Sequence, residues 1–288
     1  MRTVGIVGVG NMGGGMAAHL LAQGWTVHVH DIVREKVDAF AALGAVPCAN
    51  AAEAAQDVAA LVVCVVDAAQ AREVLFGPGG GAASLRKGAA VLLCPTISPR
   101  DVESIASQLR EIGIAAIDAP MSGGPARARD GSMSLMVACN EAVFEANRPL
   151  VEALSRKVFR VGDKVGDGAR TKLVNNLLAA INLVGAAEAI ALARKLGLDA
   201  RTTLDVIEQS SGQSWIGVDR MRRAIEGDFE PRAHMTLLAK DSRLALEEAQ
   251  AAGFEGPLGA AARDVFARAV EEGLAGLDDA ALLTLLSS

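Results

Sequence analysis

Five glycines near the start of the chain, within IVGVGNMGGGM (residues 6–16), constrain its fold more than any other feature. Glycine loses more backbone entropy on folding than any other residue, so such a cluster in a structured segment needs a compensating use. The glycines follow an apolar run of strand length at residues 3–7 and lead into a helical pattern at residues 12–23. This order predicts a tight strand-to-helix turn in which the backbone approaches another group closely.

The spacing GxGxxG, formed by Gly8, Gly10 and Gly13, is typical of a turn that binds a dinucleotide. We expect Gly8 to make the tight turn, Gly10 to let a pyrophosphate approach the backbone, and Gly13 to let the helix pack on the strand. Asn11 and Met12 start the helix, whose amides and positive dipole end suit the phosphates. Alone the motif is a weak signal, because a glycine-rich turn can be no more than a turn.

Asp31 strengthens the dinucleotide interpretation. It ends the second strand-like run, 23 residues after Gly8, where an acidic side chain binds the hydroxyls of the adenosine ribose. Its carboxylate would repel a 2′-phosphate, so we expect NAD rather than NADP, with Arg34 nearby keeping NADP as the alternative. A plain capping role for Asp31 on the next helix is the other interpretation. The motif does not require Gly14 and Gly15, and the sequence offers no reason for them.

Apolar runs of strand length alternate with helical patterns through the first half of the chain. A continuous run such as LVVCVV is typical of a parallel strand that is covered on both faces. Ser98 followed by Pro99 starts a helix, because the hydroxyl can cap it and proline suits its first turn. The alternation predicts an α/β fold with a doubly wound parallel sheet of the Rossmann type. We expect strands at residues 3–7, 25–30, 61–66, 89–93 and 114–117, and helices at residues 12–23, at residues 34–43 and from residue 98.

The pattern changes after Gly162. Residues 169–195 form one long segment with no proline, and the helical patterns that follow include no convincing strand. We therefore expect a dinucleotide-binding Rossmann domain at residues 1–162. An all-helical domain for substrate binding and oligomerisation, which starts with a long inter-domain helix, is expected at residues 163–288. Its later helices are expected at residues 200–209, 218–225, 235–250 and 257–272.

Composition excludes several other classes of protein. The net charge of −6 with no basic block argues against nucleic acid or an anionic membrane as the main partner. The four cysteines form no CxxC pair and the four histidines no HExxH, so we expect reduced core thiols and no metal. The N-terminus begins directly with a strand-like run, and no stretch of 18 unbroken apolar residues follows, so we expect a cytoplasmic protein.

The long helix carries polar residues where a packing helix would not. Lys172, Asn175 and Asn176 stand at positions i, i+3 and i+4, so they share one helical face. Buried amide and ammonium groups are costly unless something satisfies them, which makes these residues poor choices for simple packing. We expect a polar patch that faces a cleft, and a solvated helix face is the alternative.

Other candidate side chains follow the ends of strands, where doubly wound sheets bind ligands. Thr96 follows one strand, and Ser122, Gly123 and Gly124 follow another. The Ser122 hydroxyl and the two glycine amides could hold a carboxylate or could form a plain turn. No GxSxG motif surrounds Ser122, which argues against a serine hydrolase. Lys240, in LLAKD, is a second lysine within an apolar helical pattern.

Five motifs in order resemble the β-hydroxyacid dehydrogenase family, which includes 3-hydroxyisobutyrate dehydrogenase and tartronate semialdehyde reductase. They are GVGNMGGGMA near the start, PTIS around Thr96, DAPMSGGPARARDGSMSLMV at residues 118–137, KLVNNLLA from Lys172 and LLAKD at residues 237–241. The resemblance spans nearly the whole chain. It implies an NAD-dependent dehydrogenase that acts on a CH–OH group, a small hydroxy acid as substrate, and an active site in the cleft between a Rossmann domain and a helical domain. It also implies a homodimer or homotetramer.

The resemblance implies roles for the polar residues of the long helix. Lys172 would be the catalytic lysine, Asn176 would be its partner at the catalytic site, and Asn175 would lie beside it in the substrate pocket. A lysine in a water-poor cleft can lose its charge and act as a base.

The resemblance also implies roles for the residues at the strand ends. Ser122, Gly123 and Gly124 would bind the substrate carboxylate. Thr96 and Lys240 would lie beside the nicotinamide end of the cofactor.

The substrate depends on which members the chain resembles. Four segments are most similar to L-threonate dehydrogenases and other enzymes of four-carbon sugar acids. They are DAAQAREVLFG, SGQSWIGVDRM, EGDFEPRAHM and DDAALLTLL. The pair Asn175–Asn176 is instead typical of 3-hydroxyisobutyrate dehydrogenases, whereas threonate enzymes commonly carry a His–Gln pair there. We expect a four-carbon sugar acid such as L-threonate, with 3-hydroxyisobutyrate and tartronate semialdehyde as alternatives.

Functions of another kind remain as alternatives. A non-catalytic dinucleotide-binding protein with the same fold would tolerate the loss of Lys172, which is present here. Imine reductases with this architecture lack a lysine at that position. The chain is also too short for the much larger helical domain of 6-phosphogluconate dehydrogenase.

Overall fold

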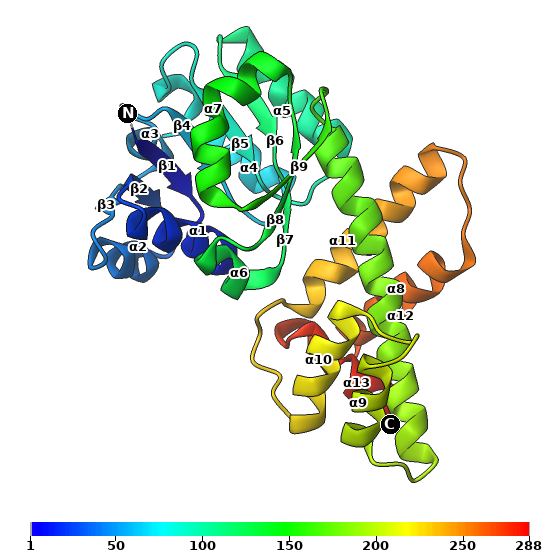
Figure 1. The fold of residues 1–288 in the computed structure, drawn as a ribbon. Coiled ribbons are helices and arrows are strands. Elements are labelled where there is room, and N and C mark those ends of the chain that lie inside the picture. The colour runs from blue at the N-terminus through cyan, green and yellow to red at the C-terminus, as the bar shows by residue number, and fades with distance from the viewer. Residues whose placement is uncertain (1, 288) are drawn as a thin grey trace. The chain divides into compact units, whose positions relative to one another are not determined.

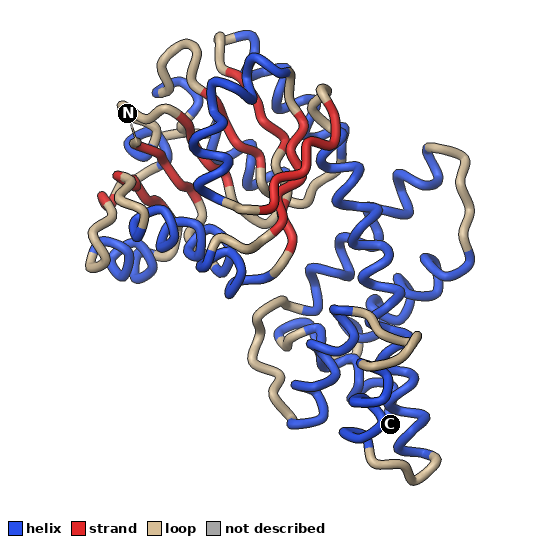
Figure 2. The backbone as a smooth tube through the Cα atoms, in the orientation of Figure 1, coloured by secondary structure: helices blue, strands red, loops and turns tan. Residues whose placement is uncertain are grey.

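The computed structural model describes residues 2–287 and divides into two compact units, Met1–Lys172 and Leu173–Ser288. The chain passes from one unit to the other within the long helix α8 (Asp167–Lys195). Strands lie in the first unit, and the second unit is helical (Figure 2).

A mostly parallel sheet forms the middle of the first unit (Figure 1). Its strand order is β3-β2-β1-β4-β5-β6-β8-β7, with β9 beside β8. The pairs from β3 to β6 are parallel, as predicted, whereas β8 runs antiparallel to β6 and β7, which the prediction did not include. The strands are β1 (Thr3–Val7), β2 (Thr26–His30), β3 (Val46–Pro47), β4 (Ala60–Val63), β5 (Ala90–Leu93), β6 (Ala115–Asp118), β7 (Met121–Ser122), β8 (Ser134–Ala138) and β9 (Lys157–Gly162).

Apolar side chains of the central strands pack on both faces of the sheet. In β4, Val62 belongs to one buried cluster with Met16 of α1, whereas Leu61 and Val63 belong to a second cluster with Ile105 of α5. This explains why the run is continuously apolar. The helices of this unit are α1 (Asn11–Ala22), α2 (Arg34–Ala41), α3 (Ala51–Ala54), α4 (Ala68–Phe76), α5 (Pro99–Glu111), α6 (Gly124–Asp130) and α7 (Glu141–Leu154).

One predicted strand is too long. The strand expected at residues 61–66 ends at Val63 in β4, and Val66 is exposed. The chain turns there because Asp67 accepts a hydrogen bond from the backbone N–H of Gln70 and caps α4. The cap predicted at Ser98 is present, since its Oγ accepts from the backbone N–H of Asp101 at 3.1 Å.

Close packing of α1 accounts for Gly14 and Gly15, for which the sequence offered no reason. A Cβ on Gly14 would lie 2.9 Å from the Phe40 ring of α2. A Cβ on Gly15 would lie 2.8 Å from the Cβ of Ala128 on α6. Both distances are too short for a real side chain, so these glycines let α1 approach two neighbouring helices.

The second unit packs its helices around one apolar core that includes Leu183, Ile190, Met221 and Phe266. Between residues 163 and 287 the structure has no strand, only an isolated bridge between His234 and Asp278. The helices after α8 are α9 (Ala200–Glu208), α10 (Trp215–Glu226), α11 (Met235–Ala251), α12 (Pro257–Glu271) and α13 (Leu282–Ser287).

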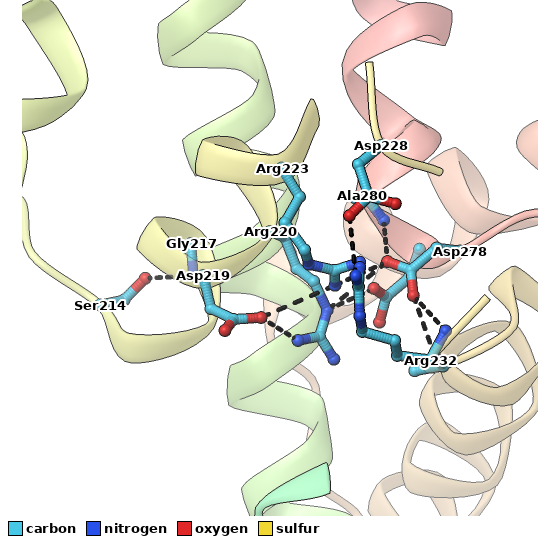
Figure 3. A network of polar contacts seen from close by, with 11 residues as sticks. Ser214, Gly217, Asp219, Arg220, Arg223, Asp228, Arg232, Asp278 and Ala280 are labelled. Carbon is cyan, nitrogen blue, oxygen red and sulfur yellow. Dashed lines mark hydrogen bonds and ion pairs between the residues drawn. The ribbon is translucent and has the colours of Figure 1, made fainter. Parts of the chain in front are cut away.

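A buried ionic network joins α10 to the segments before α11 and α13 (Figure 3). At its centre Asp278, which has no exposed surface, accepts hydrogen bonds from Arg223 Nη2 at 2.9 Å and from the backbone N–H groups of Arg232, Ala233 and Ala280 at 2.8–3.0 Å. The network unites SGQSWIGVDRM, EGDFEPRAHM and DDAALLTLL, three stretches far apart in the sequence.

Candidate functional site

The glycine-rich turn after β1 has the geometry that its spacing predicted. Gly8 has φ of +89°, and a Cβ there would lie 2.4 Å from the Cys64 carbonyl oxygen. A Cβ on Gly13 would lie 1.9 Å from the Gly8 carbonyl oxygen, so only glycine at position 13 lets α1 pack this closely against the turn. Gly10 is different, because the atom nearest to a Cβ there is Lys36 Nζ at 4.0 Å. Gly8 and Gly13 therefore serve close packing, while Gly10 leaves room beside the backbone.

The first turn of α1 suits a phosphate. Gly10 is the N-cap residue and has no side chain with which to accept hydrogen bonds from the helix amides. Asn11 and Met12 follow in the first turn, with Asn11 exposed and Met12 half-buried. A helix N-terminus without a side-chain cap offers backbone amides and positive dipole to an anion. These residues fit the pyrophosphate of a dinucleotide.

Asp31 stands beside this turn at the end of β2. Its Oδ2 accepts from the backbone N–H of Val9 at 2.9 Å, and its Oδ1 accepts from the backbone N–H of Val33 at 2.9 Å. The N-cap residue of α2 is Val33, so Asp31 does not cap that helix. Its carboxylate is instead fixed to the glycine-rich turn, where a ribose would follow the pyrophosphate.

Thr96 and the Ser122–Gly124 segment come after β5 and β6, two neighbouring parallel strands. Thr96 is half-buried, three residues beyond the end of β5. Ser122 ends the short strand β7 and pairs with Ser134 of β8. Gly123 and Gly124 then adopt φ of +134° and +76°, a backbone region that favours glycine. A side chain at either position would strain this turn, which leads directly into α6.

The three polar residues at the start of α8 differ in burial. Lys172 and Asn176 are buried, with 8% and 7% of their surface exposed, whereas Asn175 is exposed. The alternative of a solvated helix face is therefore wrong for Lys172 and Asn176. Asn175 Nδ2 donates to Asn176 Oδ1 at 3.0 Å, so a hydrogen bond joins the exposed amide to the buried one.

Asp241 of α11 contacts Asn176 and is a residue of this site that was not predicted from the sequence. Its Oδ2 accepts from Asn176 Nδ2 at 2.6 Å, and its Oδ1 accepts from Lys240 Nζ at 2.8 Å. Asp241 is 5% exposed, so its carboxylate is largely shielded from bulk water, whereas Lys240 is half-buried. This carboxylate fixes the Asn176 amide and joins it to Lys240. The sequence did carry a signal for Asp241, because a charged residue at the end of the apolar segment LLAKD is unusual in a packed helix.

Thiol chemistry is not suited to this site. All four cysteines are free, and burial raises the pKa of the Cys64 thiol to about 12. Burial also raises the pKa of Cys94 well above its usual range. A thiol with a raised pKa is a poor nucleophile at neutral pH, so these residues are core side chains.

Comparison with known proteins covers almost the entire chain. A sequence profile described as the NAD binding domain of 6-phosphogluconate dehydrogenase matches residues 3–162. A second profile, described as NAD-binding of NADP-dependent 3-hydroxyisobutyrate dehydrogenase, matches residues 166–286. The L-threonate dehydrogenase of Cupriavidus necator is 36% identical over 284 residues, which cover 99% of this chain and 96% of that protein. The chain belongs to the 3-hydroxyisobutyrate dehydrogenase-like family of β-hydroxyacid dehydrogenases.

Other members of this β-hydroxyacid dehydrogenase family are similar to the same degree. The NAD-dependent L-serine dehydrogenase of Pseudomonas aeruginosa is 35% identical, and the match covers 96% of this chain and 95% of that protein. The crystal structure of 3-hydroxyisobutyrate dehydrogenase from Salmonella typhimurium has a TM-score of 0.92 at 36% identity, covering 98% of this chain and 99% of that one. The protein is an NAD(P)-dependent hydroxyacid dehydrogenase, an oxidoreductase that acts on CH–OH, and the predicted family is confirmed.

Proposed function

We propose that this β-hydroxyacid dehydrogenase uses NAD to oxidise a four-carbon sugar acid such as L-threonate, with Lys172 as the general base. The observation that carries the proposal is a buried amine on the helix face that also carries Asn176, whose amide is fixed by Asp241. A buried ammonium with this polar surrounding is costly for packing alone and suits proton transfer. The same constellation would serve the reverse reduction.

Each residue has a defined part in the proposed reaction. The Lys172 amine, when neutral, takes the proton of the substrate hydroxyl as the carbon–hydrogen bond breaks, and it returns this proton in the reductive direction. Bound nicotinamide supplies the hydride acceptor. The amide of Asn176 orients the alcohol oxygen, because Asp241 allows that amide only a limited range of positions. Because water is excluded from the amine, the proton passes between the substrate hydroxyl and Lys172 and not to solvent.

The Ser122–Gly124 segment is proposed to bind the substrate carboxylate. Its serine hydroxyl and two glycine amides are donors, and carboxylate oxygens accept such bonds more strongly than neutral oxygens do. The positive φ values of both glycines hold these amides in a turn rather than a strand. We propose that Thr96 and Lys240 lie at the nicotinamide end of the cofactor. Lys240 would do so while paired with Asp241.

NAD is proposed as the cofactor because Asp31 presents a fixed carboxylate beside the glycine-rich turn. Arg34, the residue that kept NADP as an alternative, pairs with Asp38 at 2.9 Å. Lys36 Nζ lies 4.0 Å from Asp31 Oδ1 and partly offsets its charge. A 2′-phosphate would still meet the carboxylate at close range, whereas ribose hydroxyls would donate to it. We also propose that residues 1–162 bind the dinucleotide and that residues 163–288 form the helical substrate and oligomerisation domain.

The substrate proposal rests on similarity to L-threonate dehydrogenase along 99% of this chain. The Asn175–Asn176 pair points the other way, because it is typical of 3-hydroxyisobutyrate dehydrogenases and replaces the His–Gln pair common in threonate enzymes. 3-Hydroxyisobutyrate therefore remains the first alternative, with tartronate semialdehyde as the second.

The test is a matrix of acids and dinucleotides. L-Threonate, 3-hydroxyisobutyrate, glycerate, tartrate and L-serine are each assayed with NAD and with NADP by the absorbance of the reduced cofactor, and tartronate semialdehyde is assayed in the reductive direction. We expect the highest kcat/KM with L-threonate and NAD. Higher kcat/KM with NADP would refute the cofactor assignment, and higher kcat/KM with 3-hydroxyisobutyrate would refute the substrate assignment.

A homodimer or homotetramer is proposed from the surface of the second unit. The helix α8 is long and apolar enough to cross a membrane, but the core helices of soluble proteins can be equally long and apolar. In the most apolar 18-residue stretch of α8, 39% of the residues are buried, so much of this stretch is open to a partner. Leu192, in the last turn of α8, and Leu196, directly after its end, are 58% and 65% exposed. A second copy in the cytoplasm would cover these side chains. We expect light scattering to give a mass at least twice the 29.6 kDa of one chain, and a monomeric mass would contradict the proposal.

A further inference from the structure

Asp118 is a buried carboxylate to which the proposed reaction assigns no role. It is the last residue of β6, four residues before Ser122, and only 1% of its surface is exposed. Burial raises the pKa of this carboxyl to about 6, although the backbone amides of Ala169, Gly166 and Gly168 donate to it and act in the opposite direction. A buried carboxylate is costly unless its hydrogen bonds are strong, so its presence calls for an explanation.

The Asp118 carboxylate binds the first turn of α8. Its Oδ2 accepts hydrogen bonds from the backbone N–H groups of Gly166 and Ala169, each at 2.9 Å. These donors flank the start of the helix at Asp167. A Cβ on Gly168 would lie 2.8 Å from Asp118 Cγ, so the glycine is needed for this close approach. The beginning of α8 is therefore fixed to the end of β6.

Lys172 is on the same part of the helix. It follows Ala169 by three residues, close to one helical turn of about 3.6 residues, so the two positions are neighbours on the helix surface. A shift or rotation of the first turn would carry Lys172 with it. On the strand side, Asp118 leads through Pro120 to Ser122. One carboxylate thus connects the segment proposed to bind the substrate to the helix proposed to carry the base.

We propose that Asp118 is a positioning residue that sets where the Lys172 amine stands relative to the Ser122–Gly124 segment. The inference rests on the proposed function, which gives both of these their roles. Ser98 caps α5 and Asn140 caps α7 without a charge, and the carboxylate that caps α4, Asp67, is only half-buried, so a fully buried carboxylate at Asp118 is a different case. A carboxylate accepts stronger bonds from helix amides than a hydroxyl or an amide does. An error of about 1 Å in such placement can cost about 10²-fold in rate.

Variants at Asp118 test this role against simple destabilisation. Asp118→Ala removes the acceptor, and we expect kcat to fall about 10- to 100-fold while the dinucleotide Kd stays near the parent value. Asp118→Asn keeps one acceptor oxygen without the charge and should recover part of the lost kcat. Leu109→Ala is the control, because this fully buried residue of α5 lies near the start of β6, where its carbonyl accepts from the backbone N–H of Ile114, and not at the end that carries Asp118. It should lower Tm as much as Asp118→Ala while leaving kcat unchanged.

A second readout does not depend on turnover. Acetylation of Lys172 by N-acetoxysuccinimide, followed by mass spectrometry, is compared with acetylation of exposed Lys157 in the same protein. Asp118→Ala should speed the labelling of Lys172 several-fold, and Leu109→Ala should not. Parent values of both kcat and labelling in Asp118→Ala would overturn the positioning role, as would equal changes in Leu109→Ala. Activity retained by Lys172→Ala is a separate outcome, because it would refute the proposed base whatever Asp118 does.

Discussion

Lys172→Ala is expected to lower kcat by about 10²- to 10⁴-fold, the range that a general base contributes. The physical reason is that no other group on the same face of α8 can take the hydroxyl proton, since Asn175 and Asn176 carry amides. Binding of NADH should change little, because the proposed dinucleotide contacts lie on the glycine-rich turn and Asp31. The measurements are kcat with the best acid and NADH affinity by fluorescence. A kcat that stays within about tenfold of the parent value would show that Lys172 is not the base.

Two further variants separate proton transfer from charge and from helix stability. Lys172→Arg keeps a positive charge but cannot lose it near neutral pH, so it should be as inactive as Lys172→Ala. Lys195→Ala removes an exposed lysine from the other end of the same helix and should leave kcat unchanged. Substantial activity in Lys172→Arg would indicate that the charge, rather than proton transfer, is what the reaction needs.

Asp278→Ala is expected to lower the free energy of unfolding of the second unit by about 3–5 kcal/mol, the usual cost of breaking a buried ion pair. It would leave Arg223 with only the more distant and more exposed Asp219, 3.6 Å away, and two backbone amides before α11 without their acceptor. The measurement is urea unfolding followed by Trp215 fluorescence in a Trp25→Phe background, so that the signal comes from α10 alone.

The matched control for Asp278→Ala is Asp228→Ala. Asp228 pairs with Arg232 at 2.8 Å, but both side chains are partly exposed, and such pairs contribute about 0–1 kcal/mol. Equal destabilisation by the two substitutions would contradict the central role of Asp278.

The stabilisation from Asp278 should also depend on pH. Burial alone would raise its pKa, but hydrogen bonds from Ala233, Arg223, Ala280 and Arg232 outweigh burial and lower the pKa to about 2. Since the carboxyl has its ordinary pKa, near 4, in the unfolded chain, its contribution is present above pH 4 and is lost as the pH falls toward 2. The difference in unfolding free energy between the parent and Asp278→Ala should therefore shrink over this range.

Local features of this protein could be predicted from its sequence with good accuracy. The glycine-rich turn, the cap at Ser98 and the start of α11 at Met235 all depend on residues a few positions apart. The end of the strand predicted at residues 61–66 was wrong, because a continuous apolar run gives no signal for where a strand stops. The antiparallel strand β8 was missed because its short partner β7 pairs with it only in the folded sheet.

The candidate site could be predicted only in part. Spacing placed Lys172, Asn175 and Asn176 on one helical face, which α8 bears out. It did not separate buried Asn176 from exposed Asn175, because both stand among apolar residues. The partner that distinguishes them is Asp241, 65 residues away from Asn176 along the chain.

The sequence by itself determined the Rossmann turn, the family and the positions of α1, α2, α5 and α8 to α12, because glycine spacing and apolar periodicity act over one or two turns of backbone. Only the tertiary structure decided the partners of the buried charges. Asp118 meets Gly166 across 48 residues, and Asp278 meets Arg223 across 55. A buried carboxylate must find donors, but which donors it finds depends on how distant helices pack, and no local pattern records that choice.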